Sequence, residues 1–268
     1  MTTALPPRIT EPDRAPSGGV AVEAIHVSKQ FGHVQALRDA SVKVNHGEVV
    51  ALIGDNGAGK STFLGILQGI HRPDTGQVLI EGEPVTLHTT RDALRLGVDT
   101  VHQDLALAPD LSVVDNMFLG HECLRRGLAG RLGALTRRDM IARADEALRA
   151  LAIKLPSLTV QLRDLSGGQR QAVAVARAAM WSRTALLMDE PTAALGARQA
   201  EIVCQLMRTV AQRGQGVLVV SHDLPRILTV ADRIVILWRG EIALDAPNRG
   251  LAVPDLVATM VGYRGGAA

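Results

Sequence analysis

Two glycine-rich stretches in this sequence have the composition of phosphate-binding loops. The first covers residues 54–62, reads GDNGAGKST, and lies between an apolar stretch and a helical one. The second covers residues 165–171, reads LSGGQRQ, and opens a long apolar stretch. Unpaired backbone N–H groups at the start of a helix attract anions, because they lie at the positive end of the helix dipole. One chain therefore carries two potential phosphate sites, and the second needs an explanation.

The first loop matches the nucleotide-binding pattern G-x-x-x-x-G-K-[ST], which ends here in Gly59, Lys60 and Ser61. Glycines at 57 and 59 let the backbone approach phosphates closely, and the Lys60 ammonium can reach the β- and γ-phosphates. The Ser61 hydroxyl can ligate Mg²⁺. We therefore predict that ATP and Mg²⁺ bind here, with contacts from Gly54, Asp55, Asn56, Gly57, Ala58, Gly59, Lys60, Ser61 and Thr62.

Two carboxylates follow an apolar stretch later in the chain, where the sequence reads ALLMDE. Asp189 would end the strand and Glu190 would follow it. Alone, such a pair is typical of a solvated turn. Beside a phosphate loop, Asp189 can hold Mg²⁺ and Glu190 can act as general base on an attacking water. We predict these roles.

Strands and helices alternate around these residues. Continuous apolar strands are predicted at 49–53, 185–189, 217–222 and 233–238, with shorter β pieces at 20–27 and 40–44 and a hairpin at 76–85. Apolar strands separated by helices indicate a parallel sheet that is covered on both faces.

Helices are predicted from their start signals and apolar spacing. One covers about residues 60–68, directly after the phosphate loop. Thr136 and Asp139 resemble a capping box at the start of another. Two apolar stripes follow helical spacing, the second of which stops at Gly214; the stripes are Met140, Ala144, Leu148 and Leu151, then Ile202, Val203, Leu206 and Val210.

Composition excludes several classes. The chain has 268 residues and a formal net charge of +2, so no basic excess indicates a nucleic-acid surface. Only Cys123 and Cys204 occur, which predicts no disulfide framework and a reducing compartment, with each cysteine either an ordinary packing residue or a surface thiol. No apolar stretch approaches the length of a membrane helix, and residues 1–19 lack the apolar middle of a signal peptide. We expect those residues to be a disordered tail.

The order of these motifs resembles the ATP-binding subunit of ABC transporters over residues 20–262. The resemblance rests on the phosphate loop, a helical insert, LSGGQRQ, LLMDEP and SHD, and LSGGQRQ matches that family's signature. It implies an α/β fold of the P-loop NTPase class: a RecA-like parallel-sheet core, an antiparallel β subdomain, and an α-helical subdomain inserted at about residues 104–170. Residues 263–268 would form a second tail.

The resemblance also explains the second glycine-rich stretch. In that family two ATP-binding domains meet head to tail, and each ATP lies between the phosphate loop of one domain and the signature of the other. The signature residues would therefore complete the site of a partner subunit. By resemblance these are Ser166, Gly167, Gly168 and Gln169.

Three further positions match the family pattern. Phe31 lies where an aromatic ring stacks on adenine, with a core phenylalanine as the competing interpretation. Gln103 matches a glutamine that contacts Mg²⁺ or the attacking water and joins the helical subdomain to the core. His222 matches a histidine that contacts the γ-phosphate, and a purely structural histidine is the alternative. The apolar stretch 105–120 would form part of the surface that receives a membrane subunit.

One position departs from the family pattern. Gly196 stands where many members have an aspartate that helps join the two ATP sites. The strings AALG and NMFLG are similar to those of monosaccharide importers of the ribose, xylose and fructose type. Many of those chains are double-length, so a single-length chain would need two copies.

Three functions are compatible with these motifs. The first is an importer ATPase for a monosaccharide, working at the cytoplasmic face of the membrane with a second ATPase subunit, a membrane permease and, indirectly, an extracytoplasmic sugar-binding protein. The second is an ABC ATPase for another substrate class, such as amino acids or lipids. The third is an ABC-type ATPase acting on ribosomes or DNA. Three points disfavour the third function: the chain has a single ATPase domain, it has no sustained heptads, and we expect the basic loop 125–138 to be a solvated face.

Overall fold

The structure is a computed structural model that describes residues 18–124, 135–193 and 195–262. Of the tails expected at 1–19 and 263–268, residues 1–17 and 263–268 lie outside these residues, as does most of the basic loop 125–138. Within them, no helix is both long and apolar enough to cross a membrane.

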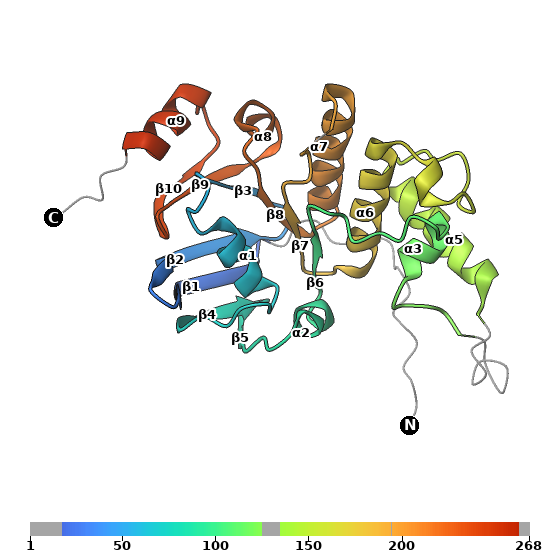
Figure 1. Cartoon of the computed structure of the whole chain (residues 1–268), viewed down its shortest axis with the longest axis horizontal. Coiled ribbons are helices and arrows are strands. Elements are labelled where there is room, and N and C mark those ends of the chain that lie inside the picture. The colour runs from blue at the N-terminus through green and yellow to red at the C-terminus, as the bar shows by residue number, and fades with distance from the viewer. Residues whose placement is uncertain (1–17, 125–134, 194, 263–268) are drawn as a thin grey trace.

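The larger of two sheets carries the continuous apolar strands (Figure 1). Its strands run in the order β10-β9-β3-β8-β7-β6, and all neighbours are parallel except the antiparallel pair of β9 and β10. The predicted parallel sheet is therefore confirmed, with an antiparallel edge. The bounds are β3 Val49–Ile53, β6 Val98–Val101, β7 Ala185–Asp189, β8 Gly216–Val220, β9 Arg233–Trp238 and β10 Glu241–Pro247.

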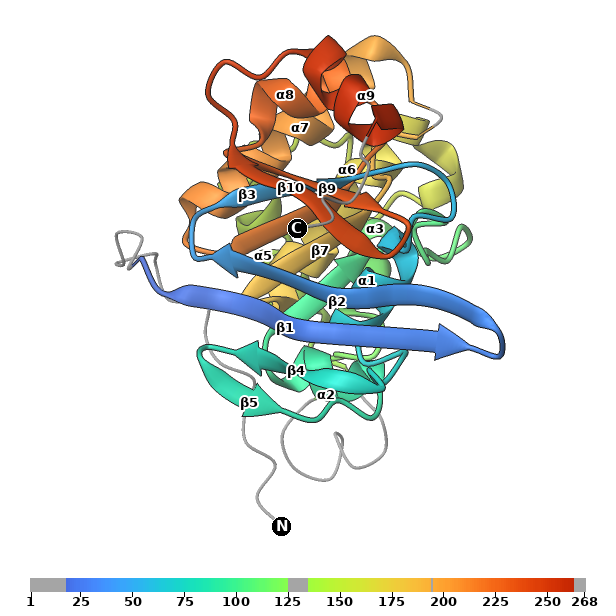
Figure 2. The same cartoon turned by 90° about the vertical axis from the view of Figure 1, so that its left-hand side faces the viewer.

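The smaller sheet is antiparallel and has the order β2-β1-β4-β5. Figure 2 shows its two long strands, β1 (Val20–Phe31) and β2 (Val34–Asn45), crossing in front of the larger sheet. They extend well past the short pieces predicted at 20–27 and 40–44. The predicted hairpin is confirmed as β4 (Thr75–Ile80) and β5 (Glu83–Val85), joined by a turn in which Glu81 and Gly82 have positive φ.

Both faces of the larger sheet are buried, as strand β3 illustrates. Val49, Ala51 and Ile53 belong to a core shared with helices α6 to α8, whereas Val50 and Leu52 belong to a core shared with the smaller sheet and α1. The helices are α1 Lys60–Leu67, α2 Thr90–Arg95, α3 Val113–Phe118, α5 Arg137–Ala150, α6 Gly167–Trp181, α7 Ala197–Gln212, α8 Leu224–Val230 and α9 Val253–Gly262, with the short 3-10 helix Leu162–Asp164 before α6.

An aromatic cluster joins α6 to α3 and α5, the helices that precede it between β6 and β7. The Trp181 indole N–H donates to the Met117 carbonyl at 2.8 Å, and the His121 ring stacks on the indole with centroids 4.1 Å apart. The Arg143 guanidinium lies 5.4 Å from the centre of the Trp181 ring. These contacts fix the carboxyl end of α6 against α3 and α5.

Two details of the helix predictions are wrong. Thr136 is the N-cap of α5, but its hydroxyl accepts no hydrogen bond from the start of that helix; it donates to the carbonyl of Cys123 at 3.0 Å. Ile202 is 43% exposed, whereas the other members of its stripe are buried. The first stripe, from Met140 to Leu151, is buried throughout, and α7 ends just before Gly214, as predicted; Gly214 has a positive φ.

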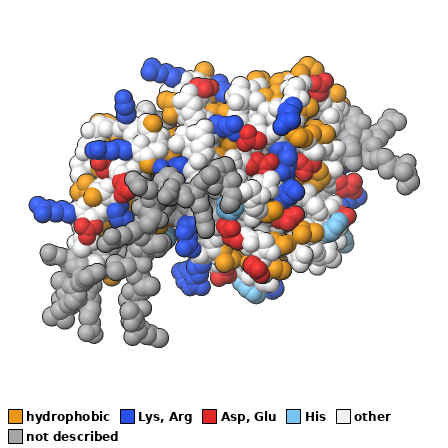
Figure 3. Space-filling model, turned by 180° about the vertical axis from the view of Figure 1, so that it is seen from behind, with side chains coloured by type: hydrophobic (Ala, Val, Ile, Leu, Met, Phe, Trp, Pro, Cys, Tyr) orange, Lys and Arg blue, Asp and Glu red, His pale blue; other side chains and the backbone are white. Residues whose placement is uncertain are grey.

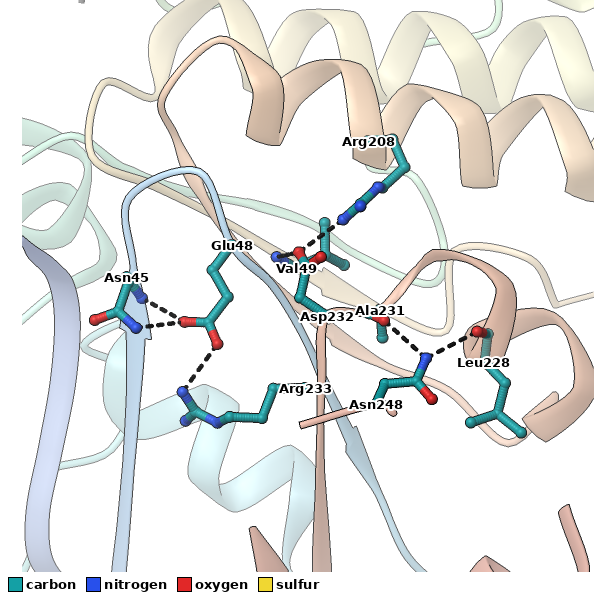
Figure 4. Close-up of polar contacts among 9 residues, drawn as sticks. All are labelled: Asn45, Glu48, Val49, Arg208, Leu228, Ala231, Asp232, Arg233 and Asn248. Atoms are coloured by element: carbon teal, nitrogen blue, oxygen red, sulfur yellow. Dashed lines mark hydrogen bonds and ion pairs between the residues drawn. The ribbon is translucent and has the colours of Figure 1, made fainter. Parts of the chain in front are cut away.

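At the edge of the larger sheet where its parallel strands begin, two acidic side chains each pair with an arginine (Figure 4). We call this side the amino edge. Asp232 accepts from the Val49 N–H at 2.9 Å and from Arg208 at 2.6 Å. Glu48 accepts from the Asn45 side chain at 2.8 Å and from Arg233 at 3.0 Å.

Arg233 is the centre of the amino edge. Its guanidinium also donates to the Lys43 carbonyl at 2.6 Å. Its Nε lies 2.7 Å from the Asp245 carboxylate, although it is not aligned for a hydrogen bond. The Arg233 side chain is only 12% exposed. It therefore joins β9 to β2, to the start of β3 and to β10.

The surface carries no large single-sign patch on the face shown in Figure 3, where basic, acidic and apolar side chains are interspersed. Both cysteines are free thiols, and Cys123 is half-buried. Cys204 is buried, and burial raises the pKa of its thiol to about 11. The Cys204 thiol therefore stays protonated and acts as a packing residue, as predicted.

Candidate functional site

The predicted site residues follow the carboxyl ends of neighbouring strands. The phosphate loop follows β3, Gln103 follows β6, Glu190 follows β7 and His222 follows β8. Because β3, β8, β7 and β6 are consecutive and parallel, these ends meet at one edge of the sheet. Ligands in α/β sheets bind at this carboxyl edge.

Tight packing of the backbone fixes the shape of the phosphate loop. Gly54, Gly57 and Gly59 have φ values of 154°, 80° and 107°, which side-chain-bearing residues rarely adopt. A Cβ atom on Gly54 would lie 2.2 Å from the Leu237 carbonyl oxygen, and one on Gly59 would lie 2.4 Å from that of Ala36. The fold therefore requires both glycines, and the loop is held rigidly over β9 and β2.

Lys60 is buried at the first position of α1, directly after this loop. Its ammonium donates to the carbonyls of Gly54 at 2.7 Å and Asp55 at 2.9 Å, so the side chain lies along the inside of the loop. Burial lowers the pKa of Lys60, while nearby carboxylates, Glu190 foremost, oppose this shift. The next residue, Ser61, is exposed at the start of α1. A cation and a hydroxyl thus flank the helix start.

The two predicted carboxylates lie at the end of β7. Burial raises the pKa of Asp189, and the neighbouring Glu190 raises it further, against the effects of His102 and Lys60. Glu190 has a φ of 48°, a left-handed conformation that is strained for this residue type. Its N–H donates to the Val220 carbonyl at 3.0 Å, which continues the pairing with β8. The strained turn directs Glu190 away from the strand.

Glu190 and His222 are in contact. The His222 Nδ1 lies 3.0 Å from the Glu190 Oε2, and the histidine side chain is 69% exposed while the glutamate is 23% exposed. A histidine so placed can orient the carboxylate and still reach solvent. The two residues were predicted separately, and their contact arises because β7 and β8 are neighbours.

His102 is a site residue that the sequence did not reveal. It lies between the end of β6 and Gln103, and it is close enough to Asp189 to oppose the rise in the pKa of that carboxyl. Its only signal in the sequence is a polar residue directly after an apolar strand. Gln103 itself is exposed at the same edge of the sheet.

Phe31 is not a core residue, because its side chain is 42% exposed at the end of β1. The His71 ring meets it edge-on at 5.1 Å, and the Lys29 ammonium lies 5.4 Å from the ring centre. Lys29 is in turn held by Asp74 at 2.7 Å. The ring is therefore supported by its neighbours and available for stacking.

The second glycine-rich stretch forms the start of α6. The Ser166 hydroxyl accepts from the Gln169 N–H at 3.3 Å, and the Gln169 side chain accepts from the Ser166 N–H at 2.9 Å. This reciprocal pair is a capping box. A Cβ atom on Gly168 would lie 2.4 Å from the Gln199 side chain, so packing against α7 requires that glycine.

Gly167 has no such requirement within the chain. It is exposed and helical, and the nearest atom that an added Cβ would meet lies 3.9 Å away on Leu195. The fold alone therefore does not explain a glycine here. A molecule that approaches the helix start from outside would explain it.

Gly196 begins α7 as its N-cap, with no side chain to accept a backbone hydrogen bond. Its neighbour Gln199 packs against Gly168 at the start of α6. The departure from the family pattern thus lies beside the LSGGQRQ stretch. Ala194, within the AALG string, lies outside the described residues.

Comparison with protein families and sequences agrees with these motifs. A family model described as ABC transporter matches residues 37–193. The chain is 42% identical to a xylose/arabinose import ATP-binding protein of Sulfolobus acidocaldarius, over 90% of this chain and 94% of that protein. It is 40% identical to a fructose import ATP-binding protein of Rhizobium meliloti, over 88% and 92%. A ribose import ATP-binding protein of Hahella chejuensis is 38% identical, but only 46% of its length is covered.

Solved structures show the same fold. The ADP conformation of an ATP-binding cassette of an ABC transporter superposes with a TM-score of 0.77 at 25% identity, over 91% of this chain and 99% of that chain. A dimeric ATP-binding cassette in a post-hydrolysis state, bound to ADP and phosphate, gives a TM-score of 0.70 at 28% identity, over 86% and 100%.

Proposed function

The chain belongs to the ABC transporter family of ATP-binding proteins, and we propose that it hydrolyses ATP to power the import of a monosaccharide. The observation that supports a sugar is the identity of 42% and 40% to xylose/arabinose and fructose import ATP-binding proteins, each over most of both chains. The AALG and NMFLG strings agree with that class.

The residues fit Mg-ATP. Backbone N–H groups of the loop 54–59 and the Lys60 ammonium would bind the phosphates, and the exposed ring of Phe31 would stack on adenine. Ser61, Gln103 and Asp189 would supply the oxygen atoms, which are the hard donors that Mg²⁺ prefers. When bound, the metal would neutralise charge on the phosphate oxygens.

Glu190 would orient the attacking water and take its proton. His222, at 3.0 Å, would hold that carboxylate in place and offer its other nitrogen to the γ-phosphate. Catalysis of this kind depends on positioning and on stabilisation of charge rather than on covalent chemistry. The strained turn at Glu190 contributes by fixing the carboxylate beside Lys60.

The second phosphate-binding stretch supports a head-to-tail dimer of two such chains. Ser166, Gly167, Gly168 and Gln169 would face the γ-phosphate that is bound to the partner, and the open space at Gly167 leaves room for it. A dimeric structure among the relatives of similar fold supports the pairing of two ATP-binding chains. Each dimer would contain two composite ATP sites.

A membrane permease would receive the motion of the dimer through the helical subdomain that we propose for residues 104–170. In this region Leu111 and Leu119 are exposed, whereas their neighbours Val113 and Phe118 are buried. The protein would thus work at the cytoplasmic face of the membrane, attached through the permease. A sugar-binding protein outside the membrane would select the substrate.

Uptake measurements test the substrate class. A strain that lacks this gene is assayed with a panel of labelled pentoses and hexoses, and with labelled amino acids as the matched alternative. We expect uptake of at least one sugar to fall and to return on complementation. Unchanged uptake of every sugar would overturn the proposal.

Mixing tests the head-to-tail dimer. Subunits with Lys60→Ala are combined with subunits whose Ser166 is replaced by Arg. In a mixed dimer one site loses both elements and the other keeps both, so ATP hydrolysis should recover above that of either variant alone. No recovery, with dimers shown by light scattering, would contradict the trans arrangement.

A further inference from the structure

Two strained residues follow Gln103 at the joint between the sheet and the helical segment. Leu105 and Ala106 have φ values of 61° and 44°, both left-handed, although neither is glycine. Such conformations cost free energy and persist only where the surroundings hold them. The Leu105 N–H donates to the His102 carbonyl at 3.0 Å, which closes a turn around Gln103. Contacts from elsewhere in the fold must therefore hold this turn.

One arginine makes those contacts. The Arg177 guanidinium donates to the Ala106 carbonyl at 2.7 Å and to the Leu105 carbonyl at 3.2 Å. It comes from the middle of α6, where the sequence reads VAVARAAM and is otherwise apolar. A planar fork of donors suits two successive carbonyls, which a lysine could not hold in the same way.

Arg177 is half-buried, and a carboxylate on β6 is close enough to act on its charge. Burial lowers the pKa of Arg177, and Asp99 on β6 opposes that shift. Asp99 is itself mostly buried, which raises the pKa of its carboxyl, and Arg177 and His102 oppose this shift. An arginine in this position is costly unless its hydrogen bonds are made. The contacts with the turn are thus part of the packing of α6 on the sheet.

A second anchor holds the far end of the same segment. Asn116 on α3 is fully buried; its side-chain oxygen accepts from the Ala108 N–H at 2.8 Å, and its amide donates to the Ala108 carbonyl at 3.0 Å. Residues 105–108 are therefore tied to α6 and α3 at both ends. Between the end of β6 and this tied segment, the backbone can still rotate at residues 102–104, which include Gln103.

We propose that Arg177 is a positioning residue that makes the turn after Gln103 move as one body with α6. Because α6 begins at the signature, a change at Gln103 on one ATP would displace the start of α6, which serves the other ATP site. Arg177 would thus couple the two composite sites of the dimer from inside each subunit. This inference depends on the proposed function, since it assigns a coupling role within that same dimer.

The test compares three variants of the full-length protein in ATP hydrolysis as a function of ATP concentration. Arg177→Lys keeps the charge that faces Asp99 but cannot hold both carbonyls, and Arg177→Ala removes both. Arg183→Ala is the matched control, because Arg183 also donates to a backbone carbonyl, that of Arg95 at 3.0 Å, on an exposed part of the surface. Binding of a fluorescent ATP analogue and thermal unfolding are measured in parallel.

We expect both Arg177 variants to bind the analogue with an affinity close to that of the natural protein. Their kcat should fall about tenfold, within the usual range of coupling between sites, and their Hill coefficient should fall toward one. The control should change neither. An Arg177→Lys protein with an unchanged Hill coefficient and kcat would overturn the inference, as would variants whose activity falls only in proportion to lost folding and lost ATP binding.

Failure of the proposed function gives a different result. A natural protein that binds ATP but never hydrolyses it would count against the proposed ATPase. A natural protein that hydrolyses ATP cooperatively, together with an equally cooperative Arg177→Lys variant, would count against Arg177 alone.

Discussion

The two edges of the larger sheet use charged residues in opposite ways. At the amino edge Arg233, Glu48 and Asp232 each have a partner of opposite charge within 3.0 Å. At the carboxyl edge Asp189 and Glu190 lie side by side, and burial and their mutual repulsion raise the pKa of Asp189. The amino edge therefore stabilises the fold. The carboxyl edge keeps two neighbouring carboxylates whose repulsion a bound metal ion would reduce.

The largest effect is expected at the carboxyl edge from Glu190→Gln. If this residue is the general base, ATP hydrolysis should fall by about 10²- to 10⁴-fold, because proton transfer by a positioned side chain contributes that much. Binding of ATP and thermal stability should be retained. Hydrolysis is measured by phosphate release, with Glu201→Gln on the exposed side of α7 as control. Full hydrolysis by the Glu190→Gln protein would remove the assignment.

The opposite edge should respond in stability instead. Arg233→Ala leaves Glu48 nearly buried without its cation, and loss of one partner from a buried pair costs about 3–5 kcal/mol. Urea denaturation measures this loss. Arg208→Ala, which breaks a pair that is about 40% exposed on both sides, should cost about 1 kcal/mol or less. Equal losses from the two variants would show that burial does not set the difference.

A smaller effect of opposite sign is expected from Asp189→Asn. The folded protein raises the pKa of Asp189, so its ionised form destabilises the fold, and removal of the charge should raise the Tm of the nucleotide-free protein. The gain should be full above the raised pKa and should shrink as pH falls through it toward the ordinary aspartate pKa. Differential scanning calorimetry across this pH range gives the comparison. A constant difference at every pH would exclude titration of Asp189 as its cause.

Asp189→Asn should also reduce the thermal stabilisation that the protein gains from Mg-ATP. Mg-ATP stabilises the folded state in proportion to its affinity, so addition of Mg-ATP should raise the Tm of the natural protein more than that of Asp189→Asn. A difference that persists with ATP and a chelator, without Mg²⁺, would show that the metal is not involved.

The smallest effect is expected at Gly196. An aspartate there would accept a backbone hydrogen bond at the start of α7, which is worth a few tenths of a kcal/mol over glycine. The Gln199 side chain would have to move, because its Oε1 lies 2.6 Å from the position of an added Cβ. Gly196→Ala gives the control without a cap. A loss of stability with Asp as large as with Ala would show that Gln199 cannot yield.

Local patterns in the sequence predicted the strands and the phosphate loop, because continuous apolar stretches and required glycines are local properties. The first two strands were predicted too short, since β1 and β2 stabilise each other over their whole length through pairing that no single segment reveals. Thr136 is the residue type of a cap and lies at the start of α5, but its hydroxyl makes a contact with the distant Cys123 carbonyl that the local pattern does not reveal.

The site was predicted as separate residues rather than as an arrangement. The roles of Phe31, Gln103 and the signature came from resemblance, and they stay predictions. The contact of His222 with Glu190, the left-handed turn at Glu190 and the position of His102 depend on the order of β6, β7 and β8 in the sheet. Spacing along the chain does not specify that order.

The aromatic cluster around Trp181 has a practical consequence. The chain contains only two tryptophans, and the other, Trp238, ends β9 in the sheet. One indole is thus packed against α3, and the other lies at the end of a strand of the larger sheet. A Trp238→Phe protein would emit from Trp181 alone, stacked on His121, so its fluorescence would report rearrangement of the helical segment without an added dye.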